Sequence, residues 1–147
     1  MSSSSLFDEK KVIVAVCNKI GKAYKTEQNY PPRRGYDIIA TKKGRPSFKF
    51  YIEAKGETSS RRGSERFGKP FDGAQVRSHF AKAFYKAAET LTHSLNKKEV
   101  VRVGIALPDN ERYRSLVRKV EPVLENLRIV VFWVFHNGEV KPSCPWK

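Results

Sequence analysis

The fold is decided by two short apolar segments, GYDIIA at residues 35–40 and FYIEAK at residues 50–55. Both segments are rich in Ile, Phe and Tyr, which favour β-strands. Residues 44–46 between them read Gly-Arg-Pro, a combination that is typical of a tight turn. The sequence therefore predicts a β-hairpin whose two strands lie side by side.

Three charged side chains fall at one end of this predicted hairpin. Glu53 and Lys55 are two residues apart and share a face of the strand, whereas Ala54 points to the other face. Antiparallel pairing brings the start of the first strand beside the end of the second, so we expect Asp37 next to Glu53 and Lys55. Two carboxylates beside one ammonium are the parts of a magnesium site next to a lysine that handles protons. The structural alternative is a surface Glu53–Lys55 pair worth about 0–1 kcal/mol beside an unrelated aspartate.

An aspartate, then a hydrophobic strand, then Glu-Ala-Lys resembles the motif of the PD-(D/E)XK nuclease superfamily of restriction enzymes, junction resolvases and repair nucleases. The matching residues are Asp37, Glu53 and Lys55, and the next predicted helix opens with Gln75, where many members carry a glutamine. Tyr36 replaces the proline before the aspartate, a position that the superfamily often varies. The resemblance covers roughly residues 8–106 and implies a restriction-endonuclease-like α/β/α sandwich with a mixed central sheet.

The resemblance also implies an activity, the Mg²⁺-dependent hydrolysis of phosphodiester bonds in nucleic acid, of restriction, defence or repair type. Asp37 and Glu53, with the backbone carbonyl of Ala54, would bind Mg²⁺, for which Mn²⁺ can substitute. Lys55 would orient or help deprotonate the attacking water, and Gln75 would position water or phosphate. Lowering the pKa of that water is the contribution expected from the ion.

The charge of the chain points to a polyanionic partner. The 147 residues carry 29 Lys and Arg against 15 Asp and Glu, a net charge of +14 and a pI near 10.0. Nucleic acid is the first expectation and an anionic membrane surface the second, while a merely basic soluble protein is the alternative. The residues do not decide between DNA and RNA, and the superfamily resemblance favours DNA.

Length, hydropathy and cysteine content set further expectations. At this length we expect one domain over residues 1–147, with irregular tails at 1–6 and 142–147. No stretch reaches the roughly 18 apolar residues of a membrane span, and the start lacks the layout of a signal peptide, which together predict a cytoplasmic protein. Cys17 lies in an apolar helical pattern and is expected in the core. Cys17 and Cys144 are the only cysteines, and structural zinc is therefore not expected.

The first predicted helix supplies a candidate for a third acidic ligand. Apolar residues repeat at helical spacing over residues 7–24, and Ser5 or Asp8 could cap the start. Superfamily members often place an acidic residue near the metal on their first helix. Glu9 is the candidate there, and Glu27 follows in the connection, where a short strand is expected at residues 26–30. For both glutamates, a solvated surface position is favoured over a role as a metal ligand.

Basic residues surround the predicted site in the sequence. Residues 56–71 are expected to form a long basic loop over the nucleic acid, and the helix predicted at 72–95 carries a polar stripe that starts at the site. His79 on that stripe is weighed as a general base, but a structural or phosphate-contact role is preferred. The candidate nucleic-acid contacts are Arg33, Arg34, Arg61, Arg62, Arg66, Lys69, His79, Lys82 and Lys86.

The rest of the chain predicts alternating strands and helices. Tyr85 is expected to be half-buried, and Trp133 to lie in the core. Pro122 is expected to interrupt and kink the helix that Asp109 or Asn110 would cap. The expected elements are a buried strand at 100–107, a helix to about 126, a second buried strand at 129–135, a tight turn at 137–138 and a short last strand.

Two further functions stay open at this stage. One is a nucleic-acid-binding module, or a subunit of a larger complex, that keeps the nuclease fold but does not cut. The other is a ribosome-associated basic protein, which would not explain the carboxylates. Small nucleases of this type often dimerise to reach two strands, although no sequence feature marks an interface.

Overall fold

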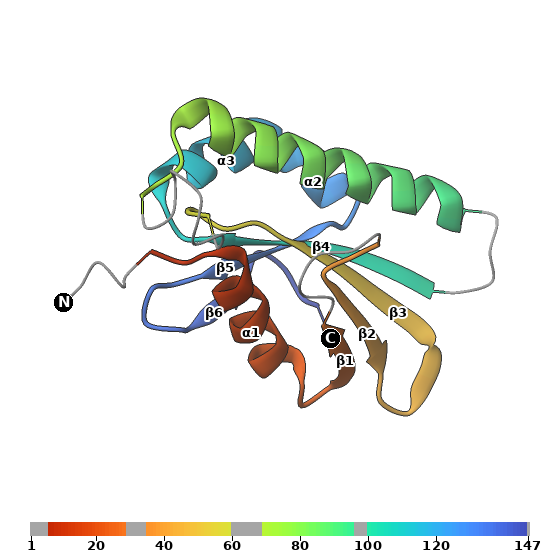
Figure 1. Cartoon of the computed structure of the whole chain (residues 1–147). Helices are drawn as coiled ribbons and strands as arrows, with labels where there is room; N and C mark the ends of the chain where they lie inside the picture. Colours follow the sequence, from red (N-terminus) through yellow and green to blue (C-terminus); the bar gives the residue numbers. More distant parts are fainter. Residues whose placement is uncertain (1–5, 29–34, 60–68, 96–99, 147) are drawn as a thin grey trace.

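One mixed sheet carries all the strands of this computed structural model, which describes residues 6–28, 35–59, 69–95 and 100–146. Helix α1 covers one face of the sheet, and α2 and α3 cover the other (Figure 1). The predicted α/β/α sandwich with a mixed sheet is therefore confirmed. The elements in chain order are α1 (Glu9–Ile20), β1 (Tyr24–Gln28), β2 (Ile38–Lys42), β3 (Arg45–Ala54), α2 (Gly73–Ser94), β4 (Val100–Pro108), α3 (Glu111–Asn126), β5 (Val130–Val134) and β6 (Val140–Pro142).

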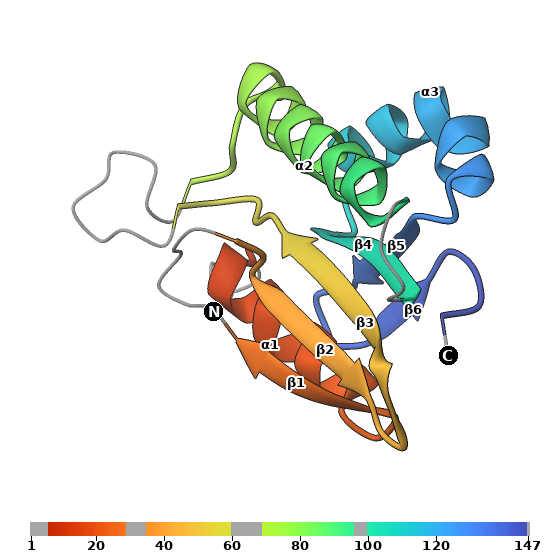
Figure 2. The same ribbon diagram turned by 90° about the vertical axis from the view of Figure 1, so that its right-hand side faces the viewer.

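The predicted hairpin is formed by β2 and β3, which pair antiparallel with Ile38 opposite Ile52 (Figure 2). Its turn lies one residue earlier than expected, at residues 43–44, because β3 already begins at Arg45. Gly44 makes this tight turn possible, since its φ of 79° lies in the left-handed region that glycine adopts without strain. The edge strand β1 also begins earlier than expected, at Tyr24.

Strands β3, β4 and β5 run parallel, and the helices α2 and α3 form the two connections between them. This arrangement explains the continuous apolar runs of β4 and β5, because parallel strands are covered by helices on both faces. Strand β6 returns antiparallel to β5. None of the described helices combines the length and the apolarity needed to cross a bilayer.

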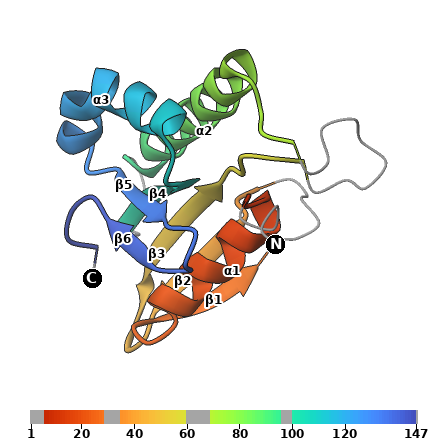
Figure 3. The same ribbon diagram turned by 90° about the vertical axis from the view of Figure 1, so that its left-hand side faces the viewer.

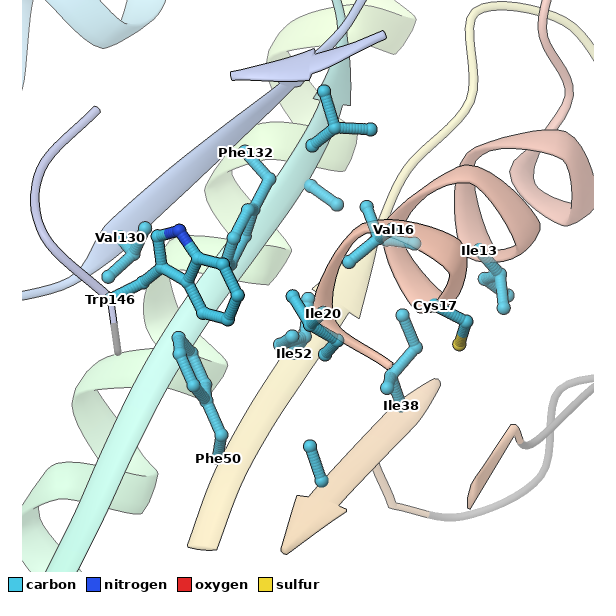
Figure 4. Close-up of a cluster of buried hydrophobic side chains, with 14 of the residues drawn as sticks. Ile13, Val16, Cys17, Ile20, Ile38, Phe50, Ile52, Val130, Phe132 and Trp146 are labelled. Carbon is cyan, nitrogen blue, oxygen red and sulfur yellow. The ribbon is translucent and has the colours of Figure 1, made fainter. Parts of the chain in front are cut away.

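The core under α1 joins segments from both ends of the chain. Ile13, Val16 and Ile20 of α1 pack on the sheet around Ile38 and Ile52 (Figure 4). Figure 3 shows α1 lying along this face of the sheet. Cys17 is buried in the same core, as predicted.

The C-terminal segment packs against the sheet through Trp146. Trp146 is buried against Phe132, and its backbone carbonyl accepts a hydrogen bond of 3.0 Å from the Tyr24 hydroxyl. The expected irregular tail is confirmed for residues 143–146, which form no helix or strand, whereas Pro142 belongs to β6. The sequence pattern does not reveal that the ring of Trp146 is buried.

The second core lies under α2 and α3, where Trp133 is buried as predicted. Two expectations for these helices were wrong. Pro122 does not interrupt α3, because it is exposed and the carbonyl that it leaves without a helical partner can be hydrated. Tyr85 is 68% exposed rather than half-buried, because it lies on the side of α2 that faces away from the sheet.

Candidate metal and nucleic-acid site

The two carboxylates of the predicted site meet at the end of the hairpin. Continuing the register by one residue beyond the Ile38–Ile52 pair places Asp37 opposite Glu53. Both side chains are buried, with 5% and 8% exposed. The Oδ2 atom of Asp37 accepts a hydrogen bond of 2.8 Å from the Ala54 backbone N–H, which fixes the carboxylate against the end of β3. The local pairing of two strands thus brings Asp37 and Glu53 together.

Glu53 lies between two lysines. Its Oε1 atom is 3.0 Å from the Nζ of Lys86 on α2, and its Oε2 atom is 3.6 Å from the Nζ of Lys55. Lys86 also donates a hydrogen bond to the Gly35 carbonyl and lies 4.8 Å from the centre of the Tyr36 ring. The polar stripe predicted on α2 therefore reaches the site through Lys86.

Tyr36, which occupies the position of the superfamily's proline, attaches the start of β2 to α2. Its hydroxyl donates to the Lys86 carbonyl at 3.0 Å and contacts the Thr90 hydroxyl. Burial raises the pKa of Tyr36 to about 12. Tyr36 thus holds α2, which carries Lys86, beside the chain segment that carries Asp37.

The electrostatics of the site show an excess of negative charge. The pKa of Asp37 is raised to about 7, first by burial and then by the charges of Glu53 and Glu9. Burial also raises the pKa of Glu9, with Lys55 acting in the opposite direction. When all groups are ionised, the site holds three negative charges and two positive ones. The negative charges are those of Glu9, Asp37 and Glu53, and the positive ones those of Lys55 and Lys86.

Of the two acidic candidates outside the motif, the structure brings Glu9 to the site. A side chain at Gly56 would place its Cβ 2.5 Å from the Glu9 backbone nitrogen, so only glycine lets the chain leave β3 this close to the start of α1. Figures 2 and 3 show the start of α1 near the end of β3. Glu27, by contrast, lies exposed on the edge strand β1.

The donor atoms present suit a small divalent cation. In the described part of the chain, no three His, Cys, Asp or Glu side chains already form a group that could hold an ion. Asp37 and Glu53 offer two carboxylates, and Mg²⁺ typically binds through one or two carboxylates while water and phosphate oxygens complete its shell. The excess negative charge at the site fits such an ion as well.

His79 also faces this region from α2. Its ring stacks on Phe71 with 4.7 Å between the ring centres. Burial lowers the pKa of His79, and the nearby charges of Lys55 and Lys82 lower it further. A neutral imidazole beside two lysines suits the phosphate contact that was preferred for His79, which stays a prediction.

Gln75 has a structural role that the sequence analysis did not assign to it, although the spacing of Asp72 and Gln75 is the signature of a capping box. Its Oε1 atom accepts a hydrogen bond of 2.9 Å from the Asp72 backbone N–H, and the Asp72 carboxylate accepts one of 2.9 Å from the Gln75 N–H. This reciprocal pair is a capping box, which begins α2. The predicted role of Gln75 in positioning water or phosphate remains untested by the structure.

The basic candidates are only partly placed. Lys82 and Lys69 are exposed, and Lys86 is half-buried at Glu53. Five arginines lie outside the described residues, namely Arg33, Arg34, Arg61, Arg62 and Arg66.

The buried residue that the sequence reading missed is Glu57. It belongs to residues 56–71, which were expected to form a long basic loop, but it is 5% exposed. Its Oε2 atom accepts from the Phe7 N–H at 2.9 Å and lies 2.5 Å from the His136 Nε2, while its Oε1 accepts from the Asn110 amide at 2.9 Å. The alternation of Glu53, Lys55 and Glu57 was the one available signal, because it continues the period of the strand.

The start of the predicted loop is therefore part of the folded body. The Tyr113 hydroxyl donates to the Gly56 carbonyl at 2.8 Å, and Thr58 forms a β-bridge with Asp8. Lys55 therefore lies between the end of β3 and a segment that the contacts of Gly56 and Glu57 hold in place.

Comparison with known proteins adds a distant structural likeness. No protein-family model and no curated protein matches the sequence. The crystal structure of an XisH family protein from Nostoc punctiforme PCC 73102 at 1.60 Å resolution is similar in fold, with a TM-score of 0.49. The likeness covers 90% of this chain and 95% of that chain at 10% sequence identity. A likeness of this size assigns the chain to no family.

Proposed function

We propose that the protein is a Mg²⁺-dependent endonuclease that hydrolyses phosphodiester bonds in DNA. The observation that carries the proposal is the meeting of Asp37 and Glu53, both buried, beside Lys55 at the end of the hairpin. Burying charge without a partner is unfavourable, so a site with excess negative charge is best explained by a cation that it binds. The net charge of +14 and the resemblance to PD-(D/E)XK nucleases support nucleic acid, and DNA in particular, as the substrate.

In this proposal each residue has a distinct task. Asp37 and Glu53 would hold Mg²⁺ together with the Ala54 carbonyl, and the Ala54 N–H keeps one oxygen of Asp37 in place. When bound, the ion supplies charge stabilisation at the scissile phosphate and a water of lowered pKa. Lys55 orients that water, helps to deprotonate it and stabilises the charge that develops on the phosphate.

Nucleic acid would bind along the polar stripe of α2 and the basic segment after β3. Lys82 and His79 continue the stripe from Lys86, and the arginines of residues 61–66 precede it in the chain. Such contacts neutralise phosphates and release counterions, so binding would weaken steeply with salt. As for other small nucleases, cleavage of both strands by a homodimer would be compatible with this arrangement.

The second candidate is a nucleic-acid-binding module that does not cut. It is favoured by the Lys86 ammonium, which already pairs with Glu53 in the position that a cation would take. Binding of this kind would need no divalent ion and would survive the loss of Asp37.

Cleavage of a labelled panel separates the two candidates. Duplex, single-stranded and branched DNA and RNA are incubated with Mg²⁺, Mn²⁺ or EDTA and the wild type, Asp37→Asn or Lys55→Met. Asp109→Asn is the matched control, because Asp109 forms an ion pair of 2.6 Å with Arg114 and takes no part in the candidate site. The nuclease proposal expects metal-dependent cutting that Asp37→Asn and Lys55→Met abolish while binding persists. Salt-sensitive binding without cutting in any metal would instead support the binding module.

A further inference from the structure

A groove of about 830 Å³ lies between α2 and α3. Figure 1 shows that both helices lie on the same side of the sheet. Its floor is apolar, and its size falls within the range of about 300–1,000 Å³ that is typical of ligand-binding clefts. The apolar side chains that line it are Val76, Phe80, Phe84, Leu116 and Val120.

The groove is separate from the candidate metal site. Besides Val76 and Phe80, the α2 residues that line it include Arg77, Ala81, Phe84 and Ala88. Successive residues turn by about 100° around a helix, which places these positions across α2 from the polar stripe that runs from Gln75 to Lys86. A partner in the groove would therefore leave the site and the polar stripe accessible.

The rim of the groove is positively charged. Arg77, Arg112 and Lys119 are exposed on it, and none of them forms an ion pair with a carboxylate among the described residues. Glu111 is the acidic residue of the rim, and its carboxylate is paired with Arg118. A ligand with an apolar stripe between acidic flanks would complement both the floor and the rim.

We propose that this groove docks an acidic amphipathic helix of a protein partner. A helix with its side chains is about 10–12 Å across, and an apolar face with anchors at i, i+3 or i+4 and i+7 is the usual occupant of such a groove. Tyr85, 68% exposed at the groove, supplies the aromatic contact that often anchors an interface. A second copy of this chain would bring its own basic rim and a net charge of +14 against the first. DNA would leave the apolar floor uncovered.

Three synthetic helical peptides test the proposal on the whole chain. The first has a Leu stripe at i, i+3 or i+4 and i+7 with Glu elsewhere, the second has the same stripe with Lys, and the third keeps Glu but replaces the stripe with Ala. Binding is measured by fluorescence anisotropy and mapped by backbone amide shifts. We expect the first peptide to bind at least about tenfold more tightly than the other two. The shifts should lie on α2 and α3, including Ala81 and Ser115.

Variants of the protein localise the binding. Ala81→Glu places a charge on the floor of the groove, and Arg112→Glu reverses a charge of the rim. Lys25 is an exposed residue of β1, and Lys25→Glu is the control for Arg112→Glu because both lower the net charge by two. Lys25→Gln lowers the net charge by one and is the control for Ala81→Glu. Each groove variant should weaken binding of the first peptide at least about tenfold relative to its control, with unchanged melting temperature and DNA binding equal to that of its control.

Four results would overturn the proposal. The first is equal binding of the striped and the Ala-substituted acidic peptides, because charge alone would then suffice. The second is no loss of binding in Ala81→Glu and Arg112→Glu. The third is a dimer in sedimentation velocity that Ala81→Glu dissociates, which would make the groove a self-interface. The fourth is weaker DNA binding by Ala81→Glu than by Lys25→Gln.

Discussion

Replacing Asp37 by Asn should stabilise the metal-free protein while it removes the proposed metal site. The pKa of Asp37 is about 7 in the folded chain against 3.8 for an unperturbed aspartate. A carboxyl with a raised pKa in the folded state contributes stability that is fully present below pH 3.8 and is lost as the pH rises through about 7. The difference corresponds to about 4 kcal/mol at pH 8.

The net gain from the substitution should be smaller than this. Asn retains an oxygen that can accept the Ala54 N–H, so the hydrogen bond at the end of β3 survives. The new amide N–H group must be buried and must find an acceptor in place of water, for which we allow about 1–2 kcal/mol. We therefore expect Asp37→Asn to raise the free energy of unfolding by about 2–3 kcal/mol at pH 8 in EDTA, and the gain to vanish near pH 4.

Urea unfolding of the wild type and the variant from pH 4 to 8, with EDTA and then with Mg²⁺, measures this effect. Saturating Mg²⁺ should stabilise the wild type, by about 2.7 kcal/mol at a hundred times its dissociation constant, and leave Asp37→Asn unchanged. Asp109→Asn, which breaks the ion pair with Arg114, should instead lower the free energy of unfolding by about 0–1 kcal/mol. A variant less stable than the wild type at pH 8, or a gain that does not depend on pH, would refute the reasoning.

Three further substitutions test other parts of the structure. Glu57→Ala should lower the free energy of unfolding by about 2–4 kcal/mol, because it leaves the Phe7 N–H and the Asn110 amide without their acceptor, and urea unfolding near the wild-type value would contradict this. Lys86→Met should tighten Mg²⁺ binding in isothermal titration calorimetry, because it frees Glu53 from the ammonium, whereas weaker binding would show that Lys86 supports the ion site. Trp146→Ala should destabilise the chain by about 3–5 kcal/mol, which thermal unfolding would detect and an unchanged melting temperature would contradict.

The sequence could predict the hairpin and its charges because both depend on neighbouring residues. Strand periodicity puts Glu53 and Lys55 on one face, and a turn near Gly44 sets the register that brings Asp37 opposite Glu53. The helical spacing of Lys86 along α2 likewise placed it on the stripe that meets the site.

What the sequence could not predict are contacts between distant segments. Glu57 is held by partners 50, 53 and 79 residues away in the chain, and Trp146 meets Tyr24 across 122 residues. Both lie in stretches whose local composition is typical of a loop or a tail, so the pattern alone gives no reason to expect either side chain to be buried. The prediction that Tyr85 is half-buried was wrong for the opposite reason. An aromatic residue on a helix is usually packed, but this one is exposed beside a groove.

The most direct test of the central claim is single-turnover cleavage of labelled duplex DNA in Mg²⁺ by the wild type, Asp37→Asn and Lys55→Met, with DNA binding measured in parallel. If Asp37, Glu53 and Lys55 form the catalytic site, both variants should bind DNA as the wild type does and cut it at least about a hundredfold more slowly. Cutting that continues at the wild-type rate in both variants, or in EDTA, would contradict the claim.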